Sequence, residues 1–421
     1  MGKNRSIISV LYGSLLLVLV TIGSCTTKPG DPEDPRLGNN GVVRPVGETT
    51  GDIIAKSIGV EGGTFMSEDG GIEVTIPAGA LAANTNIMIQ PINNTNQCGE
   101  GTAYRLSPHG QQFSKPVTIK FHYKDEQVSC SEALGIAYQD NEGKWKAVGG
   151  VVVDAVNKTI TAKTTHFSDW SFFEAFSLLP EKSYLNPGEK VSLKITHFLD
   201  AGDGLFLVPL IPEKTEVYLT EGKELQSKYI DEWKLVGEGN LVPQGVKAEY
   251  TAPAKIPTNN PAVISVRIKD GSKAVGLLIS RVFVAPEGVS LKINGGEWIT
   301  MPMGMVQSAA GVYNIMADKA GSAYPFVNII WRDPVLGEKN WKIDESIKFG
   351  YKPNQQSEYN HFYISGDAAV PSPGSLNITQ YGKVGEYVLG TFTLKKSGLI
   401  STNSLPAIAN IEGVIRIKRI K

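Results

Sequence analysis

The chain has 421 residues, which is too long for one hydrophobic core and indicates two or three domains. Its 41 basic and 42 acidic side chains give a formal charge of -1, so nucleic acid is disfavoured as a partner. With 45 Gly, 24 Pro and 15 Tyr, the composition suits short strands joined by turns, and we expect an all-β fold.

The N-terminus has the organisation of an export signal. Lys3 and Arg5 precede an apolar run over residues 7–20, and Ile22-Gly23-Ser24-Cys25 follows. This order resembles a bacterial lipoprotein signal, which implies that residues 1–24 are removed and that Cys25 carries the lipid. Two or three acyl chains would anchor the protein stably in a membrane. The alternative is an ordinary secretory signal or a single-span anchor that contains a cysteine.

Residues 25–57 are expected to form a flexible tether, because their first part is rich in Pro, Gly and Asp. Thr26, where a retention signal would have Asp, implies delivery to the outer membrane. The acidic cluster Asp31, Glu33 and Asp34 resembles the export tags of Bacteroidetes-type surface lipoproteins. We therefore expect a protein anchored by lipid in the outer membrane, with the periplasmic and surface-facing sides both left open.

Cys98 and Cys130 are the two cysteines that remain once Cys25 is assigned to lipid. An even pair in an exported chain favours a disulfide over two free thiols, and closing a loop of this length would contribute about 3 to 4 kcal/mol. No Cys/His spacing suggests a metal, and no cofactor is expected.

The first domain is expected over residues 58–178. In residues 117–123, Val117, Ile119, Phe121 and Tyr123 alternate with polar residues, which predicts a strand with one buried face. Several spaced motifs resemble those of the ZU5 domain, a β-sandwich module found in zonula occludens proteins, ankyrins, netrin receptors and bacterial surface proteins. They are Gly62-Gly63, residues 76–80 (IPAGA), residues 107–110 (SPHG), Lys115-Pro116-Val117 and His166-Phe167-Ser168.

The last of these motifs implies a possible chemistry. In some eukaryotic ZU5 relatives, a His-Phe-Ser triplet is cut by the domain itself. The resemblance would make Phe167-Ser168 the scissile bond, Ser168 the nucleophile and His166 the base. The competing interpretation is structural: Phe167 and Trp170 fill the core, and Ser168 caps a turn before Asp169. We expect no catalysis on an external substrate.

The second domain is expected over residues 179–286 and resembles a bacterial immunoglobulin-like sandwich. The resemblance places Trp233 on a central strand in the core, and residues 250–253 (YTAP) before a final strand at residues 263–268. A third domain, over residues 287–421, has strand-like runs that predict a β-sandwich or barrel. Its aromatic residues either fill that core or form a platform for sugar rings, namely Trp298, Trp331, Trp341, Tyr351 and Tyr359.

These features together predict tandem β-sandwich domains behind a signal peptide and a tether. We expect a lipid-anchored, noncatalytic envelope protein with a structural or adhesive role, whose partners are the membrane and a protein or surface polymer. One alternative is a self-cleaving module cut between Phe167 and Ser168. Another is a glycan-binding component of a polysaccharide-uptake system.

Overall fold

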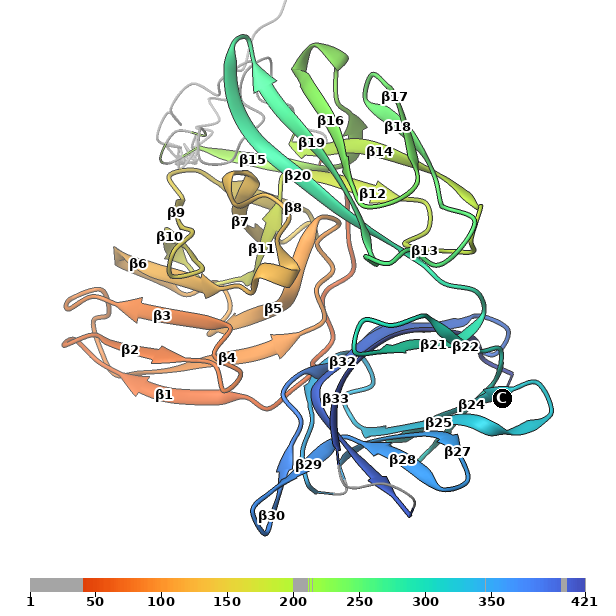
Figure 1. The fold of residues 1–421 in the computed structure, drawn as a ribbon. Helices are drawn as coiled ribbons and strands as arrows, with labels where there is room; N and C mark the ends of the chain where they lie inside the picture. The colour runs from red at the N-terminus through yellow and green to blue at the C-terminus, as the bar shows by residue number, and fades with distance from the viewer. Residues whose placement is uncertain are drawn as a thin grey trace, which may run out of the picture.

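The protein is all-β, as the composition predicts (Figure 1). The structure is a computed structural model that describes residues 41–199, 211, 213, 215–344, 346–402 and 407–420. The predicted signal peptide, Cys25 and the acidic cluster lie outside these residues. Among the described residues, no helix is long and apolar enough to cross a membrane.

The first domain is a sandwich of two antiparallel sheets. One sheet has the order β2-β3-β6-β10-β9, and the other begins β1-β4-β5-β11-β7-β8. The strands are β1 (Ile54–Ile58), β2 (Gly63–Met66), β3 (Ile72–Ile76), β4 (Thr85–Ile92), β5 (Gly99–Ser107), β6 (Gln112–His122), β7 (Leu134–Gln139), β8 (Trp145–Val148), β9 (Val152–Asp154), β10 (Thr159–His166) and β11 (Asp169–Glu174), with short 3-10 turns η1 (Asp125–Gln127) and η2 (Ser131–Ala133).

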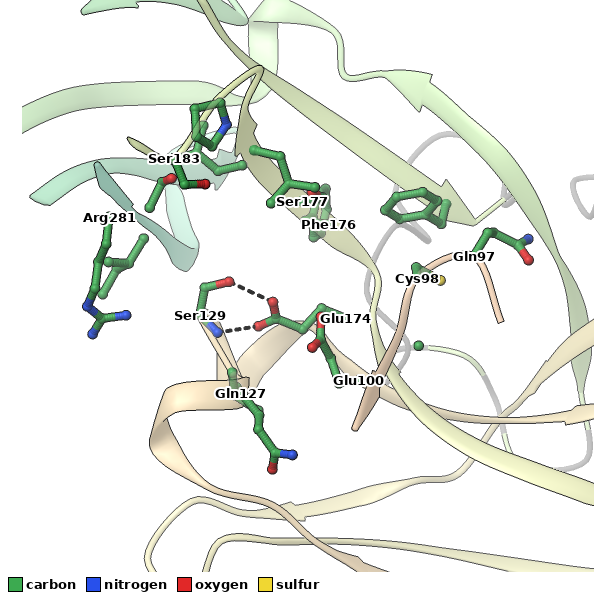
Figure 2. Close-up of a pocket in the computed structure, with 18 residues that line it drawn as sticks. Gln97, Cys98, Glu100, Gln127, Ser129, Glu174, Phe176, Ser177, Ser183 and Arg281 are labelled. Atoms are coloured by element: carbon green, nitrogen blue, oxygen red, sulfur yellow. Dashed lines mark hydrogen bonds between the residues drawn. The ribbon is translucent and has the colours of Figure 1, made fainter. Parts of the chain in front are cut away.

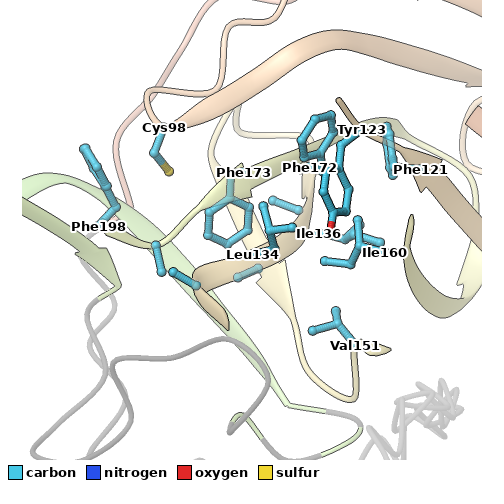
Figure 3. Close-up of a cluster of buried hydrophobic side chains, with 14 of the residues drawn as sticks. Cys98, Phe121, Tyr123, Leu134, Ile136, Val151, Ile160, Phe172, Phe173 and Phe198 are labelled. Atoms are coloured by element: carbon cyan, nitrogen blue, oxygen red, sulfur yellow. The ribbon is translucent and has the colours of Figure 1, made fainter. Parts of the chain in front are cut away.

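The core of this domain follows from strand alternation. Val117, Ile119 and Phe121 of β6 are fully buried, and Thr118 and Lys120 point the other way, as predicted. Figure 3 shows part of this core between the two sheets, where Phe121 packs against Phe172 of β11 with ring centroids 5.6 Å apart. The sandwich is therefore closed by side chains from both sheets.

Residues 41–57 are not a tether in the structure. Arg44 donates its backbone N–H to the Gly143 carbonyl at 2.8 Å, and Thr50 donates to Pro91 at 3.0 Å. β1 then pairs with β4, with Ile54 opposite Ile89. The predicted boundary at residue 57 was wrong, because the Pro-, Gly- and Asp-rich composition belongs to the residues before position 41. Residues 41–57 run along the sandwich in irregular backbone and are fixed by a few scattered hydrogen bonds.

The second domain shares a sheet with the first. β15 pairs with β8 on one side and with β14 on the other, so the sheet continues β8-β15-β14-β18-β17, and β12 also pairs with β14 (Figure 1). A second sheet has the order β13-β20-β19-β16. The elements are β12 (Phe176–Pro180), β13 (Tyr184–Leu185), β14 (Lys190–Leu199), β15 (Glu216–Glu224), η4 (Ser227–Tyr229), β16 (Ile230–Val236), β17 (Asn240–Gln244), β18 (Lys247–Thr251), β19 (Ala262–Asp270) and β20 (Lys273–Val284).

Two details differ from the immunoglobulin-like expectation. Trp233 lies on β16, at the edge of its sheet, and is half-buried with its indole N–H donated to Gly245 at 2.9 Å. Tyr250 is fully buried in this domain, and its hydroxyl donates to the Glu238 carbonyl at 2.7 Å. The strand over residues 263–268 is also not the last, because β20 follows it. A tryptophan in a strand-like run does not show whether that strand is central or at an edge.

The third domain is a strongly curved sheet around its own core (Figure 1). Its order is β22-β21-β33-β32-β28-β27-β25-β24-β23. Gly304 of β23, at one edge of this sheet, lies against Ile417 of β33 near the other edge, so the sheet curls toward a barrel. The strands are β21 (Gly288–Ile293), β22 (Ile299–Met301), β23 (Met303–Ala309), β24 (Val312–Lys319), β25 (Ser322–Arg332), β26 (Gly337–Asn340), β27 (Ile347–Asn354), β28 (Ser357–Asn360), β29 (Phe362–Ser365), β30 (Ala368–Pro371), β31 (Ser375–Tyr381), β32 (Tyr387–Ser401) and β33 (Ala407–Lys418).

Candidate functional sites in the first domain and at its junction

The His166-Phe167-Ser168 triplet lies where the chain crosses from one sheet of the first domain to the other. β10 ends at His166 in the five-stranded sheet, and β11 begins at Asp169 in the large sheet. The Phe167 side chain is buried between the sheets, with its ring 4.7 Å from that of Phe113. Its backbone N–H donates to Gln111 at 3.1 Å, and its carbonyl accepts from Gly110 at 3.0 Å. The crossover is thus fixed by packing and by hydrogen bonds.

The serine and histidine of this triplet have separate partners. Ser168 is buried, and its hydroxyl donates to the Gln139 carbonyl at 2.5 Å. The His166 ring lies 3.2 Å from the Thr164 hydroxyl through Nδ1 and packs edge-on against Tyr138. Burial lowers the pKa of His166, which favours the neutral imidazole. No hydrogen bond joins His166 to Ser168, so the hydroxyl is held by a carbonyl that cannot remove its proton.

The predicted disulfide between Cys98 and Cys130 is not formed. Both are buried free thiols. The Cys98 sulfur donates to Asn96 Oδ1 at 3.4 Å, and the Cys130 sulfur packs against Gly276 of β20 in the second domain. The two sulfurs therefore contact different residues and not each other. Sequence spacing gave the wrong result because it carries no information on the direction of the two Cβ atoms.

Next to these thiols, two carboxyl groups face one cavity of about 430 Å³ between the first and second domains (Figure 2). Glu174 is buried and accepts the Ser129 backbone N–H at 2.7 Å, the Ser129 hydroxyl at 2.6 Å and the Cys130 N–H at 2.5 Å. Burial raises its pKa despite these donors. Burial and the neighbouring Glu174 raise the pKa of Glu100 to about 8.

The sequence reasoning missed this carboxyl pair. Glu174 could have been found in the sequence, because it ends the aromatic-rich run DWSFFE. Every residue of this run is buried in the structure. Glu100 gave no such signal, because its neighbour in space is 74 positions away in the chain. Among the described residues, no group of three or more His, Cys, Asp or Glu side chains could hold a metal ion.

The aromatic residues of the third domain do not form a sugar platform. Trp331, Trp341 and Tyr351 are buried in the core, where Trp341 donates its indole N–H to the Thr393 carbonyl at 2.7 Å. Trp298 and Tyr359 are half-buried, and Trp298 donates to Pro257 of the second domain at 2.9 Å. These rings therefore fill the interior and the domain contact.

Comparison with known families assigns the first domain. Residues 55–140 match the ZU5 domain. The match starts in β1 and ends just after β7, so it covers most of the first sandwich and stops before the crossover at His166. ZU5 domains are a family of nonenzymatic interaction modules, and residues 55–140 of this chain are similar to that family. No curated protein matches this chain.

Proposed function

We propose that the protein is a lipid-anchored, noncatalytic component of a bacterial cell envelope, in which the ZU5 domain and the two domains after it present a rigid surface to a protein or polymer partner. One structural observation supports this proposal most strongly: the ZU5 sheet continues through β8 and β15 into the second domain. A continuous hydrogen-bonded sheet resists bending between the modules, which suits a support that holds a binding surface at a fixed distance.

The contacts around this seam add further rigidity. Tyr138 donates its hydroxyl to Glu216 at 2.6 Å, and Arg44 forms an ion pair with Glu221 at 2.6 Å. Gln97 also donates its side-chain amide to the Thr220 carbonyl at 2.9 Å. Tyr138 and Gln97 join the ZU5 domain to β15, and Arg44 joins the N-terminal segment to the same strand, so all three parts are linked at this seam.

The location rests on the N-terminal sequence. The run Ile22-Gly23-Ser24-Cys25 after an apolar stretch is the motif that a lipoprotein signal peptidase accepts, and Thr26 follows it. With residues 1–24 removed and Cys25 acylated, the lipid would be attached at the first residue of the mature chain, ahead of all the described residues. The ZU5 domain would then be the domain nearest to the anchor in the chain, and the third domain the farthest from it.

The proposal is tested by lipid labelling in a bacterium that processes lipoproteins. The native chain should incorporate labelled palmitate and sediment with membranes, whereas Cys25→Ala should do neither. Thr27→Ala, two positions away, is the matched control and should behave like the native chain. An unlabelled native protein that stays in the soluble fraction would refute the envelope function.

A further inference from the structure

A second cavity lies between the second and third domains. It has a volume of about 760 Å³, and its walls come from the segment around β13, from β20 and from strands β31, β32 and β33. The two domains are held together beside it, where Tyr184 packs with Ala285 and Val414. A concave site of this size at a domain junction is the usual setting for a small ligand.

One wall of this cavity contains a buried cation. Arg416 is 8% exposed and forms no salt bridge in the part of the chain that the structure describes. Its guanidinium donates to Asn186 Oδ1 at 2.7 Å and to the Ala285 carbonyl at 3.5 Å, and it lies 4.9 Å from the centre of the Tyr387 ring. All three partners are neutral. A buried charge is costly without an opposite charge, so this arginine calls for an anion.

The carboxylates of the same wall make no direct contact with Arg416, although its charge helps to lower the pKa of Glu189. Glu189 is engaged by Lys182 at 2.8 Å and accepts the backbone N–H of Asn186 at 2.8 Å. Glu181 is exposed at the rim. The charge of Arg416 therefore stays without a direct carboxylate contact.

A second arginine lines the cavity from β20. Arg281 is exposed and has no hydrogen-bond or ion-pair partner among the described residues. It also lines the cavity that holds Glu100 and Glu174, together with Pro180 and Ser183, so the two cavities adjoin at these residues (Figure 2). A ligand in the larger cavity would meet two guanidinium groups, one fixed and one free to adjust.

The remaining lining favours a sugar ring over a simple ion. Phe283 is half-buried and stacks on the buried Tyr184 with ring centroids 4.9 Å apart, so Phe283 is the ring that offers an aromatic surface to the apolar face of a pyranose. Ser183 and Gln380 add a hydroxyl and an amide group that can hydrogen-bond to ring hydroxyls, whereas the Thr379 hydroxyl is engaged by Tyr184 and Leu389. Guanidinium groups match the geometry of a carboxylate.

We propose that this cavity binds a carboxylated sugar of the uronic acid class, with Arg416 and Arg281 facing its carboxylate and Phe283 beside its ring. The inference goes beyond the proposed function, because it rests on the cavity and needs neither the lipid nor the ZU5 domain. Failure of lipid labelling would leave it standing, and failure of sugar binding would leave the envelope location standing.

The test is calorimetric titration of the mature chain with trigalacturonate, with a hyaluronan tetrasaccharide and with neutral maltotriose. At least one acidic sugar should bind at least about tenfold more tightly than maltotriose, since a charge-assisted contact is lost with the neutral sugar. Added salt should weaken the binding. Heat signals absent for both acidic sugars, or equal affinity for the neutral one, would overturn the proposal.

Variants locate the binding. Arg281→Ala changes an exposed side chain and should weaken acidic-sugar binding several-fold without unfolding the protein, while Arg416→Gln should weaken it about tenfold or more. Arg267→Ala is the control, because this exposed arginine of β19 pairs with Asp231 and Glu232 instead. Unchanged binding in Arg281→Ala would overturn the proposal even where Arg416→Gln does not fold.

Discussion

Arg105 and Asp169 form a two-point ion pair between neighbouring strands of the first domain. Arg105 Nε lies 2.8 Å from Asp169 Oδ1, and Nη2 lies 2.7 Å from Oδ2. The Asp169 carboxylate is buried, and Asp169 directly follows Ser168 in the chain. The Arg105 guanidinium also donates to the Gly47 carbonyl at 3.1 Å. One pair therefore fixes β5, the start of β11 and the N-terminal segment to one another.

Asp169→Asn should destabilise the protein by about 2 to 3 kcal/mol, because it leaves a partly buried guanidinium without its counter-charge. Urea unfolding followed by tryptophan fluorescence measures the loss. Glu249→Gln removes the exposed pair with Lys190 and should cost less than about 1 kcal/mol. Equal losses of unfolding free energy in the two variants would show that the Arg105–Asp169 pair stabilises the protein no more than an exposed pair does.

The geometry at the crossover predicts that the Phe167-Ser168 bond stays intact. The Ser168 hydroxyl donates to Gln139, so it lacks a base, and its own position is fixed by burial. Mature protein boiled in denaturant should run as one band, identical to that of Ser168→Ala. Two fragments from the native chain, with one band from Ser168→Ala, would establish self-cleavage and contradict this prediction.

Local patterns in the sequence predicted the strands and the class of fold. The alternation around Phe121 placed the correct residues in the core, because one buried face imposes a period of two on any strand. The turn motifs identified the ZU5 domain for a similar reason: Gly62 and Gly79 adopt positive φ, at 74° and 75°, where side chains other than glycine are strained.

Contacts between distant residues were not predictable from local pattern. The pairing of Val217 in β15 with Ala147 in β8 joins two domains, but each strand alone looks like any other. The same holds for Cys98 and Cys130, whose sulfurs point to different neighbours, and for Glu100 beside Glu174. The tether prediction was also wrong for residues 41–57, because the composition of the preceding Pro-, Gly- and Asp-rich stretch does not show where contacts with the sandwich begin.

The raised pKa of Glu100 predicts a pH dependence of stability. The unfolded carboxyl titrates near 4.5 and the folded one near 8, so between these values the folded state holds a proton that the unfolded state has lost. Stability should therefore fall as pH rises from about 4.5 to 8, by at most about 1.4 kcal/mol per pH unit for one proton.

Glu100→Gln should flatten this slope, since the amide does not titrate. Urea midpoints at pH 5, 6.5 and 8 provide the measurement. Glu224→Gln is the control, because hydrogen bonding to Lys247 lowers the pKa of Glu224 and its removal should not flatten the slope. A slope that is the same in the native chain and in Glu100→Gln would show that Glu100 is ionised in the fold.

The two buried thiols should be unreactive until the protein unfolds. Burial raises the pKa of Cys130 to about 12 and that of Cys98 well above its usual range, so neither forms the reactive thiolate at neutral pH. Alkylation with iodoacetamide followed by peptide mapping should label both only in denaturant. Unlabelled, disulfide-linked peptides from unreduced, denatured protein would show instead that the bridge forms.

The shared sheet predicts that the first two domains unfold as one cooperative unit. Val217 is 1% exposed and pairs with Ala147, and β14 lies on the other side of its strand, so the seam is part of the interior of both domains. Calorimetry of the native chain should show one transition for both. Val217→Asp places an unpaired charge in the seam and should cost several kcal/mol, separating the transition into two.

Val236→Asp is the control, because this valine is 55% exposed on the edge strand β16 and its substitution should change little. Two resolved transitions for these domains in the native chain would mean that they unfold independently despite the continuous sheet.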